Sequence, residues 1–221
     1  MSRVVVVGGS DQGRQTIDVL GAGAVHTVVA VLDPGLSVGS QVCGFPVIDS
    51  AGVGAVGADA FVVAVGDNAV RAAAIARVRA ERPDLALVSA VHPAAVVARD
   101  AVVGAGALVM AGAVVSNGCV VGEGVLMGTN ASIDHDCTVG EYASLAPGAT
   151  TGGNVHIGAF TAVGLGASVI HEVTIGPHTV IGAGAVVLVE VPDHVVAFGV
   201  PARVVRARAE GEPYLNRRRA G

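Results

Sequence analysis

A six-residue period runs without interruption through the second half of the chain. Every sixth residue from Val97 to Val187 is aliphatic or Met in fifteen of sixteen cases, the exception being Thr151. The residue two places before each of them is small or β-branched in all sixteen cases, and glycine follows nine times. A chance bias toward Ala, Val and Gly would lose its phase within a few steps, so we interpret the period as structural.

Such a repeat is typical of a left-handed parallel β-helix, a prism in which three six-residue segments make one coil. The aliphatic residue fills the interior and the small residue fits beside it. Residues 97 to 186 then give five complete coils. Each buried aliphatic side chain contributes about 1.5–3 kcal/mol, so a chain with no Trp and only 3% aromatic residues can still build a core.

The first 90 residues follow a different pattern, in which strands alternate with helices. Three apolar runs are interpreted as buried strands, namely Val4–Val7, Val28–Leu32 and Phe61–Val65. Helical stretches follow the first and the third run, and Asp67 is placed to cap the second helix. This alternation predicts a parallel sheet that binds ligands at the carboxyl ends of its strands.

A glycine loop follows the first strand. Ser10 stands where the dinucleotide fingerprint has its second glycine, so Gly8 and Gly13 could serve only a tight turn and close helix packing. Asp33 follows Gly13 by 20 residues, the offset at which such folds contact a ribose hydroxyl. Because this region is about half of a dinucleotide-binding fold, a mononucleotide or nucleotide-linked sugar is favoured over NAD.

Three regions are therefore expected. Residues 1–90 form a small Rossmann-like α/β domain that binds a nucleotide-linked sugar, residues 91–190 form the left-handed β-helix, and residues 191–221 form a C-terminal tail.

Composition excludes several classes of protein. Only 14% of the residues are charged and the formal net charge is −5, so the basic surface of a nucleic-acid-binding protein is missing. The basic run Arg217–Arg219 is interpreted as a solvated tail. No apolar stretch is long enough to span a membrane and no leader peptide is recognisable. Three cysteines are too few for a disulfide framework, which favours a reduced, cytoplasmic protein.

His135 stands out among the seven histidines because Asp134 and Asp136 flank it. The period places its side chain outward, on an edge shared with Gly153 and His171. An imidazole between carboxylates is a candidate general base, because neighbouring negative charge raises its basicity. A solvated surface histidine is the alternative interpretation.

Five segments carry a resemblance to a known family. They are the Gly8-Gly9-Ser10 loop, Leu32-Asp33, Ala64 to Asn68, Ile133 to Gly140, and the ending Phe198 to Arg203. Through them nearly the whole chain resembles the hexapeptide-repeat sugar acyltransferases, specifically the group of sialic acid O-acetyltransferases and nucleotide-amino-sugar N-acetyltransferases.

The resemblance implies a homotrimer with acetyl-CoA as co-substrate, bound between neighbouring β-helices, and no metal. It places His135 on the family's catalytic base and Asp136 on the acidic residue that assists it. The positions that match nucleotide-sugar contacts are Ser10, Asp11, Gln12, Asp33, Pro34 and Gly66. The positions that match the lining of the CoA groove are Ser144, Gly153, Leu165 and Ala183. The implied reaction is direct N-acetylation of a nucleotide-linked amino sugar.

The sequence departs from the family's pattern at two places. Asp11-Gln12 replaces a usual Gly-His pair, and Ser144 stands where some members carry His. The identity of the nucleotide and of the sugar is therefore left open. Two alternatives also remain: O-acetylation of a sugar hydroxyl by the same base, and a non-catalytic protein that binds nucleotide sugars. A zinc carbonic anhydrase needs three histidine ligands, and the sequence lacks the His-x4-His pair typical of that class.

Overall fold

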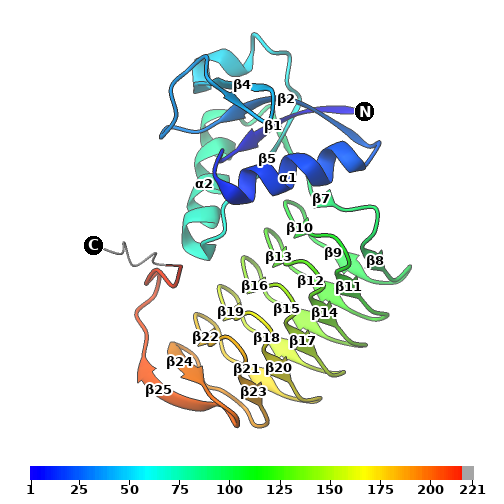
Figure 1. Ribbon diagram of the computed structural model, residues 1–221, viewed down its shortest axis with the longest axis vertical. Helices are drawn as coiled ribbons and strands as arrows, with labels where there is room; N and C mark the ends of the chain where they lie inside the picture. Colours follow the sequence, from blue (N-terminus) through cyan, green and yellow to red (C-terminus); the bar gives the residue numbers. More distant parts are fainter. Residues whose placement is uncertain (216–221) are drawn as a thin grey trace.

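The structure is a computed structural model in which residues 1–215 are described. The run Arg217–Arg219 and the end of the expected tail lie outside the described residues. Figure 1 shows an α/β unit stacked on one end of a long prism of short strands. The described residues contain no helix long and apolar enough to cross a membrane.

The α/β unit holds one six-stranded sheet between two helices. Its strand order is β3-β4-β2-β1-β5-β6, with parallel pairing throughout except between β3 and β4. In chain order the elements are β1 (Ser2–Val7), α1 (Asp11–Ala22), β2 (His26–Leu32), β3 (Gln41–Val42), β4 (Phe45–Ile48), the 3-10 turn η1 (Ser50–Val53), β5 (Ala60–Val63), α2 (Asn68–Glu81) and β6 (Ala86–Leu87).

Local chemistry explains where these elements begin and end. The four valines of β1 are buried, as expected of a central parallel strand. Helix α1 lies so close to the glycine loop that follows β1 that a Cβ on Gly13 would stand 2.1 Å from the carbonyl oxygen of Gly8. The Asp67 carboxylate accepts hydrogen bonds from the amides of Ala69 and Val70, which confirms its predicted role as the cap of α2.

The prism is a parallel β-helix with three flat faces, which confirms the predicted fold. Face 1 consists of β7 (Ala90–Val91), β10 (Leu108–Val109), β13 (Leu126–Met127), β16 (Ser144–Leu145), β19 (Ala162–Val163) and β22 (Val180–Ile181). Face 2 consists of β8 (Val96–Val97), β11 (Val114–Val115), β14 (Ser132–Ile133), β17 (Thr150–Thr151), β20 (Ser168–Val169) and β23 (Val186–Val187). Face 3 consists of β9 (Val102–Val103), β12 (Val120–Val121), β15 (Thr138–Val139), β18 (His156–Ile157) and β21 (Thr174–Ile175).

Residues 18 apart pair along each face, as Leu108 with Leu126 and Val109 with Met127 do on face 1. The interior is a continuous column of Val, Ile, Leu, Met and Ala. Cys119 and Cys137 belong to this column and are buried free thiols. The stack begins at β7, because Ala90 and Val91 already pair with β10. This start lies one strand before the first hexad of the sequence pattern.

The chain turns back after the last coil. β24 (Val195–Phe198) extends face 1, and β25 (Arg203–Ala207) pairs with it in the antiparallel sense. From there the C-terminal segment, residues 208–215, runs along the prism toward the start of α2 (Figure 1).

One buried arginine joins the two parts of the molecule. Arg71 on α2 is 0% exposed, and within residues 1–215 its guanidinium donates only to uncharged acceptors. These include the carbonyls of Gly124 and Tyr142 on the β-helix and of Val65 and Gly66 in the loop after β5. Burial lowers the pKa of Arg71 to about 10. β5 ends at Val63, two residues earlier than the sequence predicted, and the carbonyls of residues 65 and 66 bind Arg71.

Replacing Arg71 should therefore destabilise the protein. Arg71→Met leaves several buried carbonyls without a donor, and we expect the free energy of unfolding to fall by about 2–4 kcal/mol, since each bond to a charged group contributes about 1.5–3 kcal/mol. Arg77→Met, on the exposed side of the same helix, is the matched control. Urea denaturation measures both variants. Equal midpoints for the two would show that Arg71 does not hold the parts together.

Candidate active site

His135 lies in the turn between β14 and β15, on the edge where faces 2 and 3 meet. Its backbone amide donates to the Asp134 carboxylate (2.8 Å). Its Nδ1 lies 2.9 Å from the Asp136 carboxylate. Because an ionised carboxylate only accepts hydrogen bonds, Nδ1 carries the hydrogen and Nε2 keeps a free lone pair. The side chain is 47% exposed, so this lone pair can reach a ligand outside the prism.

The acidic neighbours change the proton affinity of the ring. The hydrogen bond to Asp136 is the largest influence on the pKa of His135 and raises it above the ordinary 6.5. Slight desolvation opposes this shift, and the charges of Asp134 and Asp136 reinforce it. His135 is therefore a stronger base than a free imidazole.

Two glycines leave space beside the side chains of His135 and Asp136. A Cβ on Gly153, one coil along the edge, would lie 2.5 Å from Nε2 of His135. A Cβ on Gly118, one coil in the other direction, would lie 2.3 Å from a carboxylate oxygen of Asp136. Gly153 thus lies against the imidazole of His135. The sequence did not predict the role of Gly118, because glycine is frequent at many corners of the repeat.

The one residue that breaks the aliphatic pattern lies beneath this corner. Thr151 is buried, and its hydroxyl stands 3.4 Å from the Asp134 amide and 3.5 Å from Cys137 Sγ. The Cys119 thiol donates to the Asp134 carbonyl (2.9 Å). Polar atoms of the core therefore hold the backbone of the turn that carries His135.

A groove of about 470 Å³ lies elsewhere, where face 1 approaches the α/β unit. Ser144, Leu165 and Ala183 line its β-helix side, and Gln12 and Gly66 line the side of the α/β unit. Five of the predicted binding residues are thus brought together. Two residues of the C-terminal segment, Tyr214 and Leu215, also line it and were missed, because nothing in the repeat indicates where the chain goes after its last coil.

Gln12 has an unusual position in this groove. Its Nε2 is buried and has no hydrogen-bond partner among the described residues. A buried amide donor without a partner costs about 1–3 kcal/mol, which a ligand that offers an acceptor would offset.

The glycine loop is held by the aspartate expected to contact a ribose. One Asp33 oxygen accepts from the Gly9 amide (2.7 Å) and the other from the Gly35 amide (2.8 Å). Each oxygen keeps a second lone pair for a ligand. Ser10, Asp11 and Pro34 are exposed around the same strand ends, and Asp11 pairs with Arg14 at 2.5 Å.

The predicted base and the groove therefore lie apart on one chain. His135, Asp136 and Gly153 lie on the edge between faces 2 and 3, whereas the groove follows face 1 and its edge with face 2. Face 2 separates the base from the groove.

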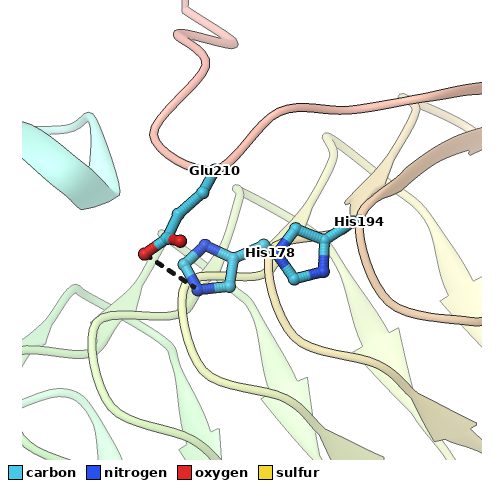
Figure 2. Close-up of side chains that lie close together, drawn as sticks. All are labelled: His178, His194 and Glu210. Atoms are coloured by element: carbon cyan, nitrogen blue, oxygen red, sulfur yellow. Dashed lines mark ion pairs between the residues drawn. The ribbon is translucent and has the colours of Figure 1, made fainter.

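A third cluster lies on the edge between faces 3 and 1 and contains none of the predicted residues. His178, His194 and Glu210 meet there, Glu210 coming from the C-terminal segment (Figure 2). His178 Nε2 lies 3.8 Å from the Glu210 carboxylate, and burial lowers the pKa of His178. The two imidazole planes are stacked within 21° of parallel, so their lone pairs do not point at a shared position. The cluster packs the C-terminal segment against the prism.

Comparison with known proteins agrees with this architecture. Residues 118–153 match the family "Bacterial transferase hexapeptide (six repeats)". The search of curated proteins found no match. PerB from Caulobacter crescentus, solved with CoA and GDP-perosamine, is 35% identical over 93% of this chain and 98% of its own, with a TM-score of 0.86. The acetyltransferase domain of PglB from Neisseria gonorrhoeae, solved with acetyl coenzyme A, is 32% identical over 92% and 99%, with a TM-score of 0.85.

WeeI from Acinetobacter baumannii shares the fold at 22% identity over 93% of this chain and all of its own, with a TM-score of 0.69. The β-helix and these relatives define a hexapeptide-repeat acyltransferase. The chain belongs to the sugar acyltransferase family in which sialic acid O-acetyltransferases are grouped with nucleotide-amino-sugar N-acetyltransferases.

If His135 is the base, activity should depend on pH in a defined way. Only the neutral imidazole accepts a proton, so kcat/KM should rise with pH, with its inflection above 6.5 because Asp136 raises the pKa of His135. In Asp136→Asn the inflection should move to lower pH. The inflection is found for both proteins by measuring kcat/KM from about pH 5 to 9, the range over which an imidazole titrates. Profiles with the same inflection would contradict the pairing of these side chains in catalysis.

Proposed function

We propose that this protein is an acetyl-CoA-dependent N-acetyltransferase that acts on a nucleotide-linked amino sugar. The observation that carries the proposal is the 35% identity, over 93% of the chain, to PerB, which was solved with CoA and GDP-perosamine. The second support is the exposed His135–Asp136 pair with a free Nε2.

The chemistry is direct transfer of the acetyl group. The sugar amine attacks the thioester carbonyl carbon of acetyl-CoA while His135 Nε2 accepts a proton from the nitrogen. Asp136 stabilises the imidazolium that forms. The C–S bond then breaks, the proton passes to the departing thiolate, and the products are the N-acetylated sugar and free CoA. No covalent enzyme intermediate is needed, because the amine attacks the thioester directly. Cys119 and Cys137, the two cysteines of the β-helix, are buried in its core.

The acceptor is held by the α/β unit. Its nucleotide lies against Ser10, Asp11, Asp33 and Pro34 at the carboxyl ends of β1 and β2, as expected of a parallel sheet. The sugar extends past Gly66 to Gln12, whose unpartnered Nε2 offers a donor to a sugar hydroxyl or a phosphate oxygen. This region corresponds to the proposed substrate domain at residues 1–90, and the acyl transfer takes place on the β-helix at residues 91–190.

The CoA arm enters the groove beside Ser144, Leu165 and Ala183, and its thioester ends next to Gly153 and His135. One chain cannot supply both the groove and the base of the same site, because face 2 lies between the groove and His135. We therefore infer a homotrimer in which the base of one chain completes the groove of its neighbour. Exposed apolar side chains flank face 2 on both edges, Leu165 on one and Ile170 and Leu188 on the other. Such side chains are suited to burial between copies.

We also propose a cytoplasmic location. Free thiols persist in a reducing compartment, and Cys119 and Cys137, which are buried and unpaired, are consistent with one.

The proposed activity is tested by offering UDP-, GDP- and dTDP-linked amino sugars together with acetyl-CoA and measuring the release of free thiol. We expect at least one acceptor to give continuous turnover and a product heavier by one acetyl group in mass spectrometry. Hydroxyl sugars that lack the amine should give none. Turnover of the hydroxyl sugars instead would show O-acetylation.

In the same assay, His135→Ala should lower kcat by about 10²–10⁴. Because the side chain is outside the core, thermal stability and CoA affinity should remain near wild type. His171→Ala is the matched control, since it occupies the same edge two coils away, about 9–10 Å along the stack. His135→Ala retaining more than half of the wild-type turnover would exclude His135 as the base.

A further inference from the structure

The C-terminal segment brings a tyrosine into the groove at the junction of the two parts of the molecule. Tyr214 Oη lies 3.0 Å from Ser144 Oγ on face 1. It also lies 3.1 Å from the Gly66 carbonyl and 2.9 Å from Asn68 Oδ1 at the start of α2. One hydroxyl therefore links the acceptor side of the groove to the proposed CoA side.

The fold builds this position rather than leaving it to an unsupported tail. The buried Arg208 donates from its amide to the His194 carbonyl (2.7 Å) and from Nη1 to the His178 carbonyl (2.7 Å). Glu212 closes the turn that follows by pairing with Arg206 and accepting from the Ala209 amide. The turn directs the chain to the groove, where Leu215 comes within 3.1 Å of a Cβ position on Gly66.

Counting hydrogens fixes the role of Ser144. The Gly66 carbonyl and Asn68 Oδ1 can only accept, so the single Tyr214 hydrogen goes to one of them. Ser144 must then donate its own hydrogen to Tyr214 Oη. What remains on Ser144 Oγ is an acceptor that faces the groove. Desolvation raises the pKa of Tyr214, so the phenol keeps its hydrogen at neutral pH.

We propose that Tyr214 is a positioning residue for CoA, which holds Ser144 as a hydrogen-bond acceptor for an amide N–H of the pantetheine arm. That arm combines amide groups with apolar carbons, which suits a groove lined by Leu165, Ala183 and Leu215 with one oriented hydroxyl. This inference rests on the proposed function, because it assigns the groove to the acyl donor.

The structure also predicts that the hydroxyl is dispensable for stability. Arg71 donates to the same two acceptors, to the Gly66 carbonyl at 2.9 Å and to Asn68 Oδ1 at 2.8 Å. Both acceptors therefore keep a hydrogen-bond partner in Tyr214→Phe, and the phenyl ring still occupies the same place in the wall of the groove. Ser144 alone loses its side-chain partner and is free to turn its hydrogen toward the ligand.

The test is calorimetric titration of CoA into the intact protein. Tyr214→Phe should weaken CoA binding about tenfold, the effect of about 1.4 kcal/mol, with a melting temperature within roughly 3 °C of wild type. In turnover, KM for acetyl-CoA should rise while KM for the acceptor and kcat stay within about twofold. Tyr142→Phe is the matched control, because its hydroxyl binds Glu123 (2.7 Å) and does not line the groove. In a protein that already carries Ser144→Ala, adding Tyr214→Phe should weaken CoA binding little further.

Unchanged CoA affinity in Tyr214→Phe would overturn the proposal, as would an equal loss in Tyr142→Phe or losses that simply add in the double variant. A loss confined to acceptor binding would also overturn it and assign the residue to the sugar instead. Wild-type protein that binds CoA but acetylates no amino sugar would refute the proposed function, while the binding comparison would still decide the role of Tyr214.

Discussion

The stacking of residues 18 apart in parallel register is the constraint on which every other feature depends. Because no residue is inserted between β7 and β23, each side chain keeps its face or edge from coil to coil. A shift by one residue would turn the interior column outward. The base, the glycines beside it and the groove thus inherit their positions from the packing of small aliphatic residues rather than from local loops.

Function is added to this frame by local exceptions. Thr151 interrupts the aliphatic column directly below the turn of His135, and its hydroxyl lies 3.4 Å from the Asp134 amide. Gly153 leaves space at the free nitrogen of the imidazole. Arg71 attaches the α/β unit to the coils with a buried cation that donates to uncharged carbonyl oxygens. Each departure places a group that the regular repeat could not hold.

The sequence predicts the parts that periodicity controls and fails where the chain leaves the period. The β-helix, the cap at Asp67 and the outward direction of His135 follow from spacing and propensity. Strands β3 and β4 have no such signal, since Pro46 and Gly44 interrupt a short run. The approach of Tyr214 to Ser144 depends on tertiary contacts over 70 residues of sequence. The roles assigned to the site residues remain proposals that come from family resemblance.

The central claim is that a base on one chain and a groove on its neighbour form one site. It is tested most directly by mixing two inactive variants, His135→Ala and a blocked groove, Ala183→Trp, each with a different affinity tag. If sites are shared, each mixed trimer has one intact site out of three, so the doubly purified mixture should show about a third of the wild-type activity per site, measured as thiol release. Activity no higher than that of either parent would place the whole site within one chain and contradict the account.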